Sequence, residues 1–358
     1  MTSTQASSNG GRVALVIGAT GGVGGEAAIA LLRHGWTVRA LTRRAQPAKS
    51  GIEWIVGDAM VADDVARAAQ GVQLIVHAAN PPGYKDWDKL VLPMLDNTIA
   101  AAKANGARIL LPGTVYNFGL ETFPLIDETA PQTPATRKGK IRVEMERRLK
   151  AASAQGAPVL IVRAGDFFGP HAGNNWFGQA VVKPGAPLKS VTEPSAKGLP
   201  HAWAYLPDLA ETMARLLDQE DRLSGFEVFH FGGHLLAWGE MAASVRRVTD
   251  QPKLPVMSFP WWLIVGLSPA VPLFREMAEM RYLWREPLVL DDRKLRAFLE
   301  DVPETPLDTA VAASLRALGC LPVSNPLPLG EGLGGAPPIS ASRSAPSPRP
   351  GSAPWRRR

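Results

Sequence analysis

The chain has 358 residues, of which 46% are hydrophobic and 20% are charged, as in ordinary soluble globular proteins of one or two domains. Five of the basic residues that make up its formal net charge of +6 lie in the C-terminal tail: Arg343, Arg349, Arg356, Arg357 and Arg358. The rest of the chain is close to neutral, so the charge does not indicate nucleic-acid binding. The single cysteine, Cys320, excludes an internal disulfide framework and a cysteine-based metal site, and it fits a cytoplasmic location.

The two ends of the chain differ in composition from its body. Residues 1–10 are small and polar, which predicts a disordered lead-in without the basic and apolar segments of a signal peptide. Residues 321–358 are rich in Pro, Gly, Ser and Arg, which predicts a disordered tail. Because no stretch of about 20 uninterrupted apolar residues occurs, we expect no transmembrane helix.

A strand, a glycine-rich turn and a helix are predicted between Gly11 and His34. In this arrangement Gly18 would allow a tight turn, Gly21 would let backbone N–H groups approach a dinucleotide pyrophosphate, and Gly24 would let the helix pack on the strand. The helix N-terminus would add a partial positive charge. A purely structural turn is the alternative. The cofactor-binding residues predicted here are Gly18, Thr20, Gly21, Gly22, Val23 and Gly24.

Further strands and helices alternate up to residue 165. The strands are expected at 36–41, 52–56, 73–77, 108–111 and 158–163, and the helices near 61–69, 87–104 and 139–154. Alternating β and α units of this length predict a Rossmann-type α/β core over 11–165, with a doubly wound parallel sheet and right-handed crossovers.

Residues 166–320 predict a smaller substrate-binding region. Its first part, 165–200, has no clear period and predicts long loops at the end of the sheet. A strand at 226–231 is expected to return to the core sheet. Helices are expected at 206–217, 236–249, 275–284, 291–299 and 307–318, the first of them capped by Asp208.

The end of the second strand bears on the choice of cofactor. An NAD site usually has an acidic residue there to accept a hydrogen bond from the ribose 2′-OH, but here Arg43 and Arg44 follow. Guanidinium groups suit a 2′-phosphate, so we predict NADP, with NAD kept open and a solvated arginine pair as the alternative. Asp58 is placed to accept a hydrogen bond from the adenine amine. The small residues after the fourth strand would line the cofactor: Ala78, Ala79 and Asn80.

Several segments, taken in order, resemble one family. GATGGVG at 18–24, GD at 57–58 and HAAN at 77–80 are similar to short-chain dehydrogenases/reductases of the extended or atypical type, the relatives of NAD-dependent epimerases and dehydratases. PGTVYNFG at 112–119, LIVRAGDFFGP at 160–170 and YLPDLA at 205–210 extend the likeness to about residues 12–320. The resemblance implies an NAD(P) cofactor, a small-molecule substrate and a homodimer formed through a helix pair.

The resemblance also implies catalytic positions, and one of them departs from the family. Members that oxidise or reduce use a tyrosine and a lysine, separated by three residues, as a proton-transferring pair, with a glutamate four residues later. Lys140 and Glu144 match the lysine and the glutamate, whereas Thr136 stands at the tyrosine position. A threonine hydroxyl is shorter and far less acidic than a phenol, so it cannot simply replace one. Thr114 matches the family's catalytic Ser or Thr and could polarise a carbonyl.

The source of the proton is therefore open. Tyr116 or Tyr205 could supply it, although Tyr116 also suits a packing position. Water or the substrate could supply it, or the protein binds NADPH without turnover. The catalytic residues that we predict are Thr114, Lys140 and Tyr116.

Aromatic residues and amides in the region after residue 165 indicate a medium-sized, partly apolar substrate rather than a highly charged sugar nucleotide. The candidate substrate contacts are Phe168, Asn175, Trp176, Trp203 and Tyr205, each of which could instead serve packing. His171 and His201 could act as acid or base, although a lone loop histidine is usually solvated. Trp261 and Trp262 predict a lid over the core rather than a membrane anchor.

These features predict an NADP(H)-dependent oxidoreductase that acts on a small, partly apolar carbonyl or hydroxyl compound. A non-catalytic NADP(H)-binding regulator or scaffold is the alternative, because of Thr136. A sugar-nucleotide epimerase or dehydratase is a weaker alternative, because the tyrosine is missing and basic residues are sparse over 165–205.

Overall fold

The computed structural model describes residues 11–48, 51–81, 87–173 and 175–322. The lead-in predicted over 1–10 lies outside the described residues, as does the predicted tail from residue 323 onward.

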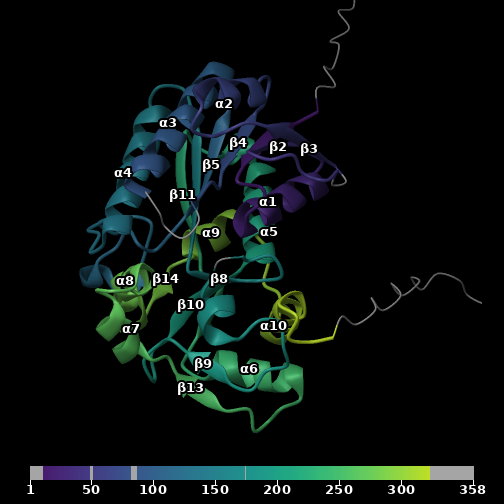
Figure 1. Ribbon diagram of the computed structural model, residues 1–358. Helices are drawn as coiled ribbons and strands as arrows, with labels where there is room; N and C mark the ends of the chain where they lie inside the picture. Colours follow the sequence, from purple (N-terminus) through teal and green to yellow (C-terminus); the bar gives the residue numbers. More distant parts are fainter. Residues whose placement is uncertain (1–10, 49–50, 82–86, 174, 323–358) are drawn as a thin grey trace, which may run out of the picture. The chain divides into compact units, whose positions relative to one another are not determined.

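A seven-stranded parallel sheet with the strand order β11-β7-β5-β4-β1-β2-β3 forms the centre of the fold (Figure 1). Its strands are β1 (Val13–Ile17), β2 (Thr37–Thr42), β3 (Ile52–Val56), β4 (Leu74–His77), β5 (Arg108–Gly113), β7 (Val159–Ala164) and β11 (Phe226–Phe231). The inner strands are buried on both faces, as expected for a parallel sheet covered on both sides. The predicted Rossmann-type fold is confirmed, including the return of 226–231 to the sheet.

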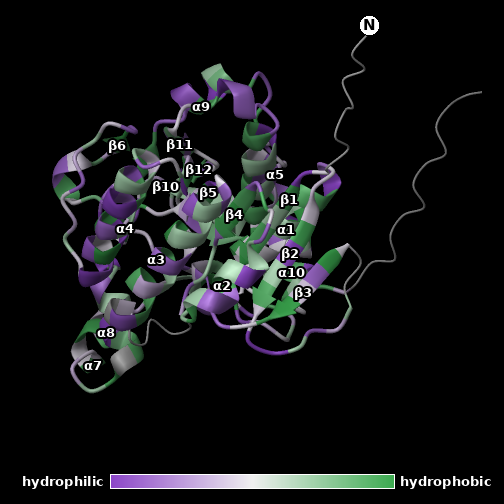
Figure 2. Ribbon diagram, turned by 90° about the horizontal axis from the view of Figure 1, so that it is seen from above, coloured by the Kyte–Doolittle hydropathy of each residue, from purple (hydrophilic) through white to green (hydrophobic). Residues whose placement is uncertain are grey.

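Helices cover both faces of this sheet. One face packs against α2 (Ala62–Ala68), α3 (Trp87–Asn105) and α4 (Arg137–Ser153), and the other against α1 (Gly22–Arg33), α5 (Leu206–Leu217) and α9 (Arg293–Phe298). Side chains alternate along each strand, so Ala14 and Val16 join the α1 side of the core and Leu15 and Ile17 join the α3 side. Figure 2 shows the hydrophobic residues concentrated on β1, β2 and β3, whereas α4 and α9 carry many hydrophilic ones.

The segment 165–200 was predicted as loops, and this was wrong in part. It contains β8 (Asp166–Phe168), the π-helical turn η3 (Phe177–Val181) and β9 (Val191–Glu193). Two short sheets include strands of this segment: β12 (His234–Leu236), β10 (His201–Tyr205) and β8 pair in that order, and β13 (Val256–Ser258) pairs with β9. In a third short sheet, β14 (Val289–Leu290) pairs with β6 (Leu125–Ile126). Strands of two to five residues are too short to give a visible period.

The remaining helices follow the sequence prediction with two corrections. The first is that α6 (Glu240–Thr249) begins later than expected, because the preceding residues form β12 and Gly239 has a φ of 92°. The second is that the helix expected over 275–284 is divided into α8 (Pro272–Glu279) and the 3₁₀ turn η5 (Arg281–Trp284). The others are α7 (Trp261–Leu267), α10 (Leu307–Ala317) and the 3₁₀ turns η2 (Leu120–Thr122) and η4 (Glu220–Arg222).

The prediction that Asp208 caps α5 was wrong. The residue that precedes this helix is Tyr205, which makes no side-chain cap. The Asp208 carboxylate instead accepts hydrogen bonds from the backbone N–H and the hydroxyl of Thr305, both at 2.7 Å. It therefore ties the chain after α9 to α5.

The two tryptophans of α7 have different surroundings. Trp261 donates a hydrogen bond from Nε1 to the carbonyl oxygen of Pro194 at 2.8 Å and packs against Trp176. Trp262 is 77% exposed. Within the described residues, none of the helices combines the length and the apolar character needed to cross a bilayer.

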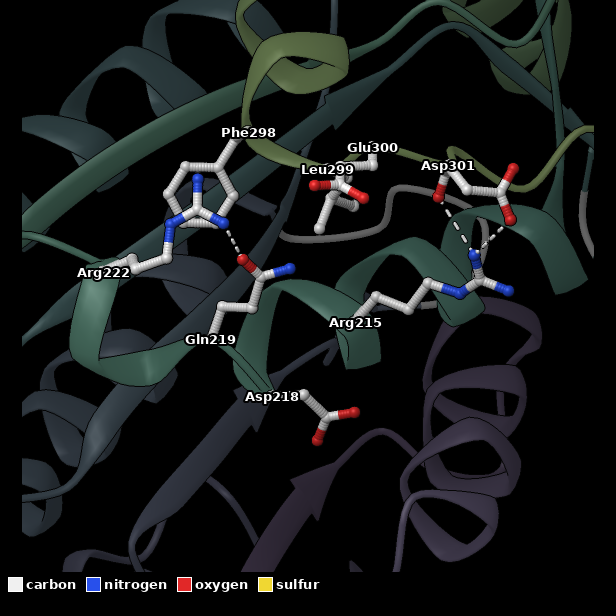
Figure 3. A pocket seen from close by; sticks show the side chains of 8 residues that line it. All are labelled: Arg215, Asp218, Gln219, Arg222, Phe298, Leu299, Glu300 and Asp301. Carbon is white, nitrogen blue, oxygen red and sulfur yellow. Dashed lines mark hydrogen bonds and ion pairs between the residues drawn. The ribbon is translucent and has the colours of Figure 1, made fainter.

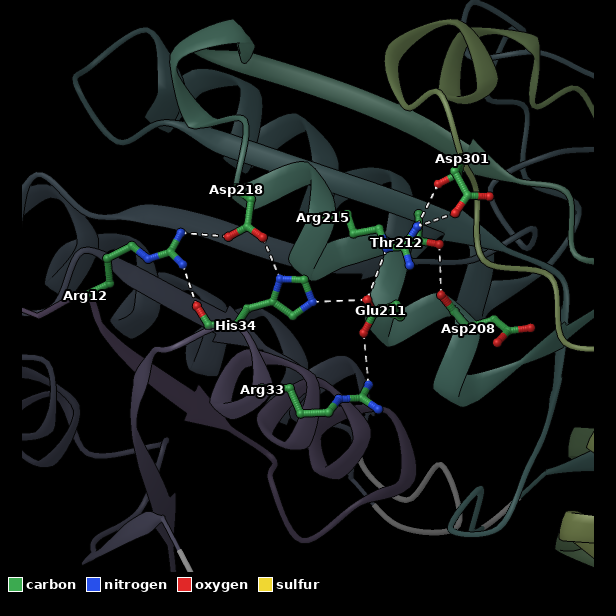
Figure 4. A network of polar contacts seen from close by, with 9 residues as sticks. All are labelled: Arg12, Arg33, His34, Asp208, Glu211, Thr212, Arg215, Asp218 and Asp301. Carbon is green, nitrogen blue, oxygen red and sulfur yellow. Dashed lines mark hydrogen bonds and ion pairs between the residues drawn. The ribbon is translucent and has the colours of Figure 1, made fainter. Parts of the chain in front are cut away.

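A polar network joins α1 to α5 at the amino edge of the sheet (Figure 4). His34 lies between two carboxylates, with Nδ1 2.5 Å from Asp218 Oδ2 and Nε2 3.1 Å from Glu211 Oε1. Arg12 also contacts Asp218 at 2.8 Å, and Arg33 contacts Glu211 at 3.0 Å. These contacts fix the ends of α1 and α5, whose N-termini lie toward the opposite edge.

Candidate functional site

The glycine turn joins β1 to α1 at the carboxyl edge of the sheet, where ligands of such folds bind. Gly18 has a φ of 98°, and a Cβ there would lie 2.5 Å from the carbonyl oxygen of Ala78. A Cβ on Gly24 would lie 2.3 Å from the carbonyl oxygen of Gly18. Gly21, by contrast, would meet only that oxygen, at 3.3 Å. The turn therefore keeps strand, helix and β4 in close contact and leaves the outer side of Gly21 open.

One side of this turn is covered by the loop that follows β8. A Cβ on Gly22 would lie 2.7 Å from the carbonyl oxygens of both His171 and Ala172. The His171 ring reaches across to α1, with Nδ1 2.7 Å from Glu26 Oε1. His171 thus binds a buried carboxylate of the first helix, a contact that the sequence analysis missed because 145 residues separate the two.

The other predicted cofactor residues lie along the same edge. Arg43 and Arg44 follow β2 with exposed side chains, and neither forms an ion pair with a described residue. The Thr42 hydroxyl donates a hydrogen bond to the carbonyl oxygen of Arg44 at 2.9 Å, which fixes the turn that carries them. Asp58 Oδ1 accepts a hydrogen bond from the N–H of Met60 at 3.0 Å. Ala78 and Ala79 are half-buried after β4, and the side chains of Thr20 and Asn80 are exposed.

A small cavity lies where β5 and β7 end, two and three strands from β1 in the sheet. It is lined by Thr114, Val115, Tyr116, Ala164, Gly165, Asp166 and Phe167. The structure thus brings the predicted residues Thr114 and Tyr116 together on the edge that carries the glycine turn. Thr114 Oγ1 donates a hydrogen bond to Asn117 Oδ1 at 3.3 Å.

Thr136, which the sequence analysis assigned to the tyrosine position, forms a hydrogen bond with the backbone. Its Oγ1 accepts a hydrogen bond from the N–H of Gly139 at 2.9 Å and caps α4. Gly139 packs so closely on Tyr116 that a Cβ would lie 2.2 Å from the Tyr116 carbonyl oxygen. Lys140 is exposed in the first turn, whereas Lys138 is buried and forms an ion pair with Glu276 at 2.7 Å.

A buried polar network contacts Thr114, one of the residues that line the cavity. Glu146 lies 2.9 Å from Arg163 Nη2, and Arg163 Nη1 donates to the carbonyl oxygen of Thr114 at 2.6 Å. Arg163 Nε donates to His230 Nε2 at 3.2 Å, and His230 Nδ1 lies 3.1 Å from the carbonyl oxygen of Ile126. Burial, and next the charge of Arg163, lower the pKa of His230 to about 3, so this imidazole is neutral. The network holds Thr114 in place.

Asp166, which lines the same cavity, forms a second buried pair with His201. Asp166 Oδ2 is 2.7 Å from His201 Nε2, and the exposed fractions of the two side chains are 6% and 1%. The imidazole stacks on Trp284, with ring centroids 3.9 Å apart. His201 is therefore a buried strand residue rather than the solvated loop histidine that is usual for its sequence context.

The predicted substrate-contacting aromatic residues occupy a second hydrophobic core. Phe168, Trp203 and Tyr205 are buried, and the rings of Trp203 and Tyr205 both pack against Phe168. Trp176 is partly buried against Trp284. The Asn175 side chain accepts a hydrogen bond from the N–H of Gly178 at 2.8 Å and so helps to form η3. Such burial favours packing roles for the three aromatic residues.

A larger cavity of about 450 Å³ lies at the end of α5, beside the chain that follows α9 (Figure 3). Arg215 and Asp301 form an ion pair at its rim, and Arg222 stacks on Phe298. It adjoins Asp218 at the amino edge of the sheet, whereas the glycine turn and the expected ligand site lie at the carboxyl edge. No cluster of three or more metal-ligating side chains occurs among the residues that the structure describes.

Comparison with solved structures shows the same fold. MoeE5, solved with UDP-glucuronic acid and NAD, is 16% identical with a TM-score of 0.65, over 86% of this chain and 98% of that one. The UDP-glucose 4-epimerase of Bifidobacterium longum, solved with NAD+ and UDP, is 16% identical with a TM-score of 0.63, over 85% and 97%. The UDP-glucuronic acid 4-epimerase of Bacillus cereus, solved with NAD, is 16% identical with a TM-score of 0.66, over 86% and 98%.

No curated protein matches the sequence. The sequence model of the NAD dependent epimerase/dehydratase family, however, matches residues 14–232, which is more than half of the chain. The matched range includes the glycine turn, Thr114, Thr136 and Asp166. The chain therefore belongs to the NAD dependent epimerase/dehydratase family.

Proposed function

We propose that the protein binds NADP(H) and transfers a hydride to or from a small molecule at a carbon that carries a hydroxyl or carbonyl oxygen. The observation that supports this most is the glycine turn at the N-terminus of α1, where a Cβ on Gly21 would meet only the carbonyl oxygen of Gly18, at 3.3 Å. Backbone N–H groups there suit a diphosphate. When bound, the nicotinamide supplies the hydride acceptor or donor.

Different residues along the carboxyl edge of the sheet would bind the cofactor and the substrate. Arg43 and Arg44, exposed after β2, would pair with the 2′-phosphate. Lys140, exposed in the first turn of α4, would contact the nicotinamide ribose. Thr114, held through its carbonyl oxygen by Arg163, would donate a hydrogen bond to the substrate oxygen.

A sugar-nucleotide epimerase or dehydratase is the second candidate, and the comparisons favour it more than the sequence did. Similar structures carry UDP sugars or UDP together with NAD. The burial of Phe168, Trp203 and Tyr205 also weakens the sequence argument for an apolar substrate. Both candidates share a hydride transfer from a carbon that carries a hydroxyl, and they differ in whether the reduced cofactor is released.

Calorimetric titration tests the cofactor first. We expect wild-type protein to bind NADP+ at least tenfold more tightly than NAD+, and the double variant Arg43→Ala/Arg44→Ala to lose this preference, because each charged hydrogen bond contributes about 1.5–3 kcal/mol. Arg33→Ala, which removes an exposed arginine at the opposite edge, is the control. Absence of binding at several hundred micromolar of either cofactor would refute the proposal.

Assays of catalytic turnover then distinguish the two candidate functions. A net oxidoreductase changes absorbance at 340 nm with one member of a carbonyl and alcohol panel. An epimerase interconverts UDP-glucose or UDP-N-acetylglucosamine with its 4-epimer without net change in the cofactor. If the cofactor binds but neither panel reacts, the non-catalytic regulator becomes the better interpretation.

A further inference from the structure

We propose that Asp166 is the proton-accepting group of this site and that His201 positions its carboxylate. The proposal rests on the hydride-transfer function proposed above. It gives the site an acid–base group, which this chain lacks at the tyrosine position of the family pattern because Thr136 stands there.

One oxygen of the Asp166 carboxylate is hydrogen-bonded to His201, and the other is available to a ligand. Asp166 Oδ2 lies 2.7 Å from His201 Nε2. No described residue donates a hydrogen bond to Oδ1, although the residue lines the cavity together with Thr114 and Tyr116. A hydroxyl bound beside Thr114 would therefore find an unpaired carboxylate oxygen.

The surroundings of His201 set the direction of the hydrogen bond within the pair. Its Nδ1 is buried without a hydrogen-bond partner among the described residues, and its ring stacks on Trp284. A hydrogen on Nδ1 would leave a buried N–H unpaired, so the neutral tautomer with its hydrogen on Nε2 fits best. That N–H donates to Asp166 Oδ2. The imidazole thus acts as a neutral donor that stabilises and orients the Asp166 carboxylate.

Other candidates for the proton are less well placed. Thr136 already accepts the hydrogen bond that caps α4. Burial raises the pKa of Tyr205 to about 12, with further contributions from Asp208 and Glu26, so its phenolate is disfavoured. Tyr282 donates its hydroxyl hydrogen to the carbonyl oxygen of Phe118 at 3.1 Å. Tyr116 lines the same cavity and is the competitor that the experiment must separate from Asp166.

The position in the sheet connects the carboxylate to the cofactor. A diphosphate bound at β1 with its adenosine toward β2 would direct the nicotinamide half toward β4 and β5, which lie on the other side of β1 in the sheet. Asp166 directly follows β7, the next strand. In the oxidation direction Asp166 would accept the hydroxyl proton of an alcohol, and the oxidised nicotinamide would supply the hydride acceptor, so that the alcohol would become a carbonyl. In the reverse direction protonated Asp166 would return the proton.

This placement can be tested without knowing the substrate. The oxidised nicotinamide ring is cationic and the reduced ring is neutral, so a nearby carboxylate strengthens binding of the oxidised cofactor relative to the reduced one. A base within reach of a substrate oxygen at this ring lies within about 8 Å of it, where Coulomb's law gives roughly a twofold preference at the dielectric constant of water and roughly a thirtyfold preference at an effective value of about 20. We would measure the Kd values of NADP+ and NADPH calorimetrically for wild-type protein and for Asp166→Asn.

The variants provide matched controls. We expect Asp166→Asn to shift the NADPH-to-NADP+ ratio of Kd values toward the reduced cofactor, by roughly twofold to thirtyfold. Glu193→Gln, which neutralises a buried carboxyl group away from the cavity, and Tyr116→Phe should leave the ratio unchanged. His201→Leu should shift it in the same direction as Asp166→Asn, and His201→Gln, which keeps an N–H donor, should restore most of it. Circular dichroism melting shows whether each variant folds.

Each outcome decides between the proposals. If wild-type protein binds neither form of the cofactor, the proposed function fails and this inference falls with it. If the cofactor binds and the ratio in Asp166→Asn equals that of wild type, only the assignment of Asp166 is overturned. A shift in Tyr116→Phe instead would assign the role to the tyrosine. Identical ratios in the two His201 variants would overturn the positioning role of His201.

Discussion

The Thr136 hydroxyl accepts a hydrogen bond from the backbone N–H of Gly139 at 2.9 Å, so the residue at the family's tyrosine position serves as the N-cap of α4. Removal of an N-cap side chain costs about 1 kcal/mol of stability. We therefore expect Thr136→Ala to lower the free energy of unfolding by about 1 kcal/mol, and Thr136→Ser to lower it by much less. Urea denaturation measures both values.

Cofactor binding is the control for this prediction. If Thr136 only caps the helix, the Kd of NADPH changes less than about threefold in Thr136→Ala. A large loss of affinity at unchanged stability would contradict the capping role and would place the hydroxyl in the cofactor site.

The glycine turn predicts different effects for two neighbouring alanine substitutions. A Cβ at Gly24 would overlap the Gly18 carbonyl oxygen at 2.3 Å, so the helix would have to move from the strand. We expect Gly24→Ala to lower the free energy of unfolding by more than about 2 kcal/mol, as overpacked cores do. Gly21→Ala meets the same oxygen only at 3.3 Å, so it should fold with a loss below about 1 kcal/mol.

Titration with NADP+ completes that comparison. The added methyl group of Gly21→Ala would stand where the diphosphate approaches, so affinity should fall at least tenfold although the protein is folded. Wild-type affinity in Gly21→Ala would mean that the phosphates lie elsewhere.

The sequence predicted those parts of the molecule whose signals are local. The glycine spacing and the long β-branched runs, such as the one that ends at Ile17, specify a strand, a turn and a helix within about 20 residues, and these predictions are confirmed. Short strands such as β8 and β9 have three residues each and give no period.

Contacts between distant residues were also beyond sequence reasoning. Asp166 and His201 are 35 residues apart and meet only because β8 pairs with β10. The one available signal was a charged residue inside an apolar strand, as with Arg163 in β7, because a buried charge requires a partner.

The buried carboxyl group of Glu193 predicts a pH dependence of stability. Burial raises its pKa to about 7, from an ordinary value near 4.5, although it accepts hydrogen bonds from the N–H groups of Ala242 and Gly239. Because the folded pKa is the higher one, stability is fully present below about pH 4.5 and is lost as the pH rises through 7. The difference between the two pKa values corresponds to about 3 kcal/mol.

The variant Glu193→Gln isolates this contribution, since its amide oxygen still accepts the same hydrogen bonds. We expect the difference in unfolding free energy between Glu193→Gln and wild type to grow in favour of the variant between pH 4.5 and pH 8. Urea denaturation at the two values measures it. A constant difference would show that the carboxyl group has an ordinary pKa in the folded protein.

The ion pair of Glu146 and Arg163 gives the last prediction. Both side chains are buried, and Glu146 also accepts hydrogen bonds from Asn117 at 2.9 Å and Gln132 at 2.6 Å. Removal of one partner leaves the other charge unpaired in the interior, which costs about 3–5 kcal/mol, so Glu146→Leu and Arg163→Met should each be strongly destabilised.

A double-mutant cycle distinguishes this pairing from a simple loss of packing. Because the double variant leaves no unpaired charge, it should lose less stability than either single variant, with a coupling energy above about 2 kcal/mol. Additive losses would mean that the two charges do not stabilise each other. Since Arg163 Nη1 also binds the carbonyl oxygen of Thr114, the double variant should release that segment, which hydrogen exchange at the Val115 amide would report as lost protection.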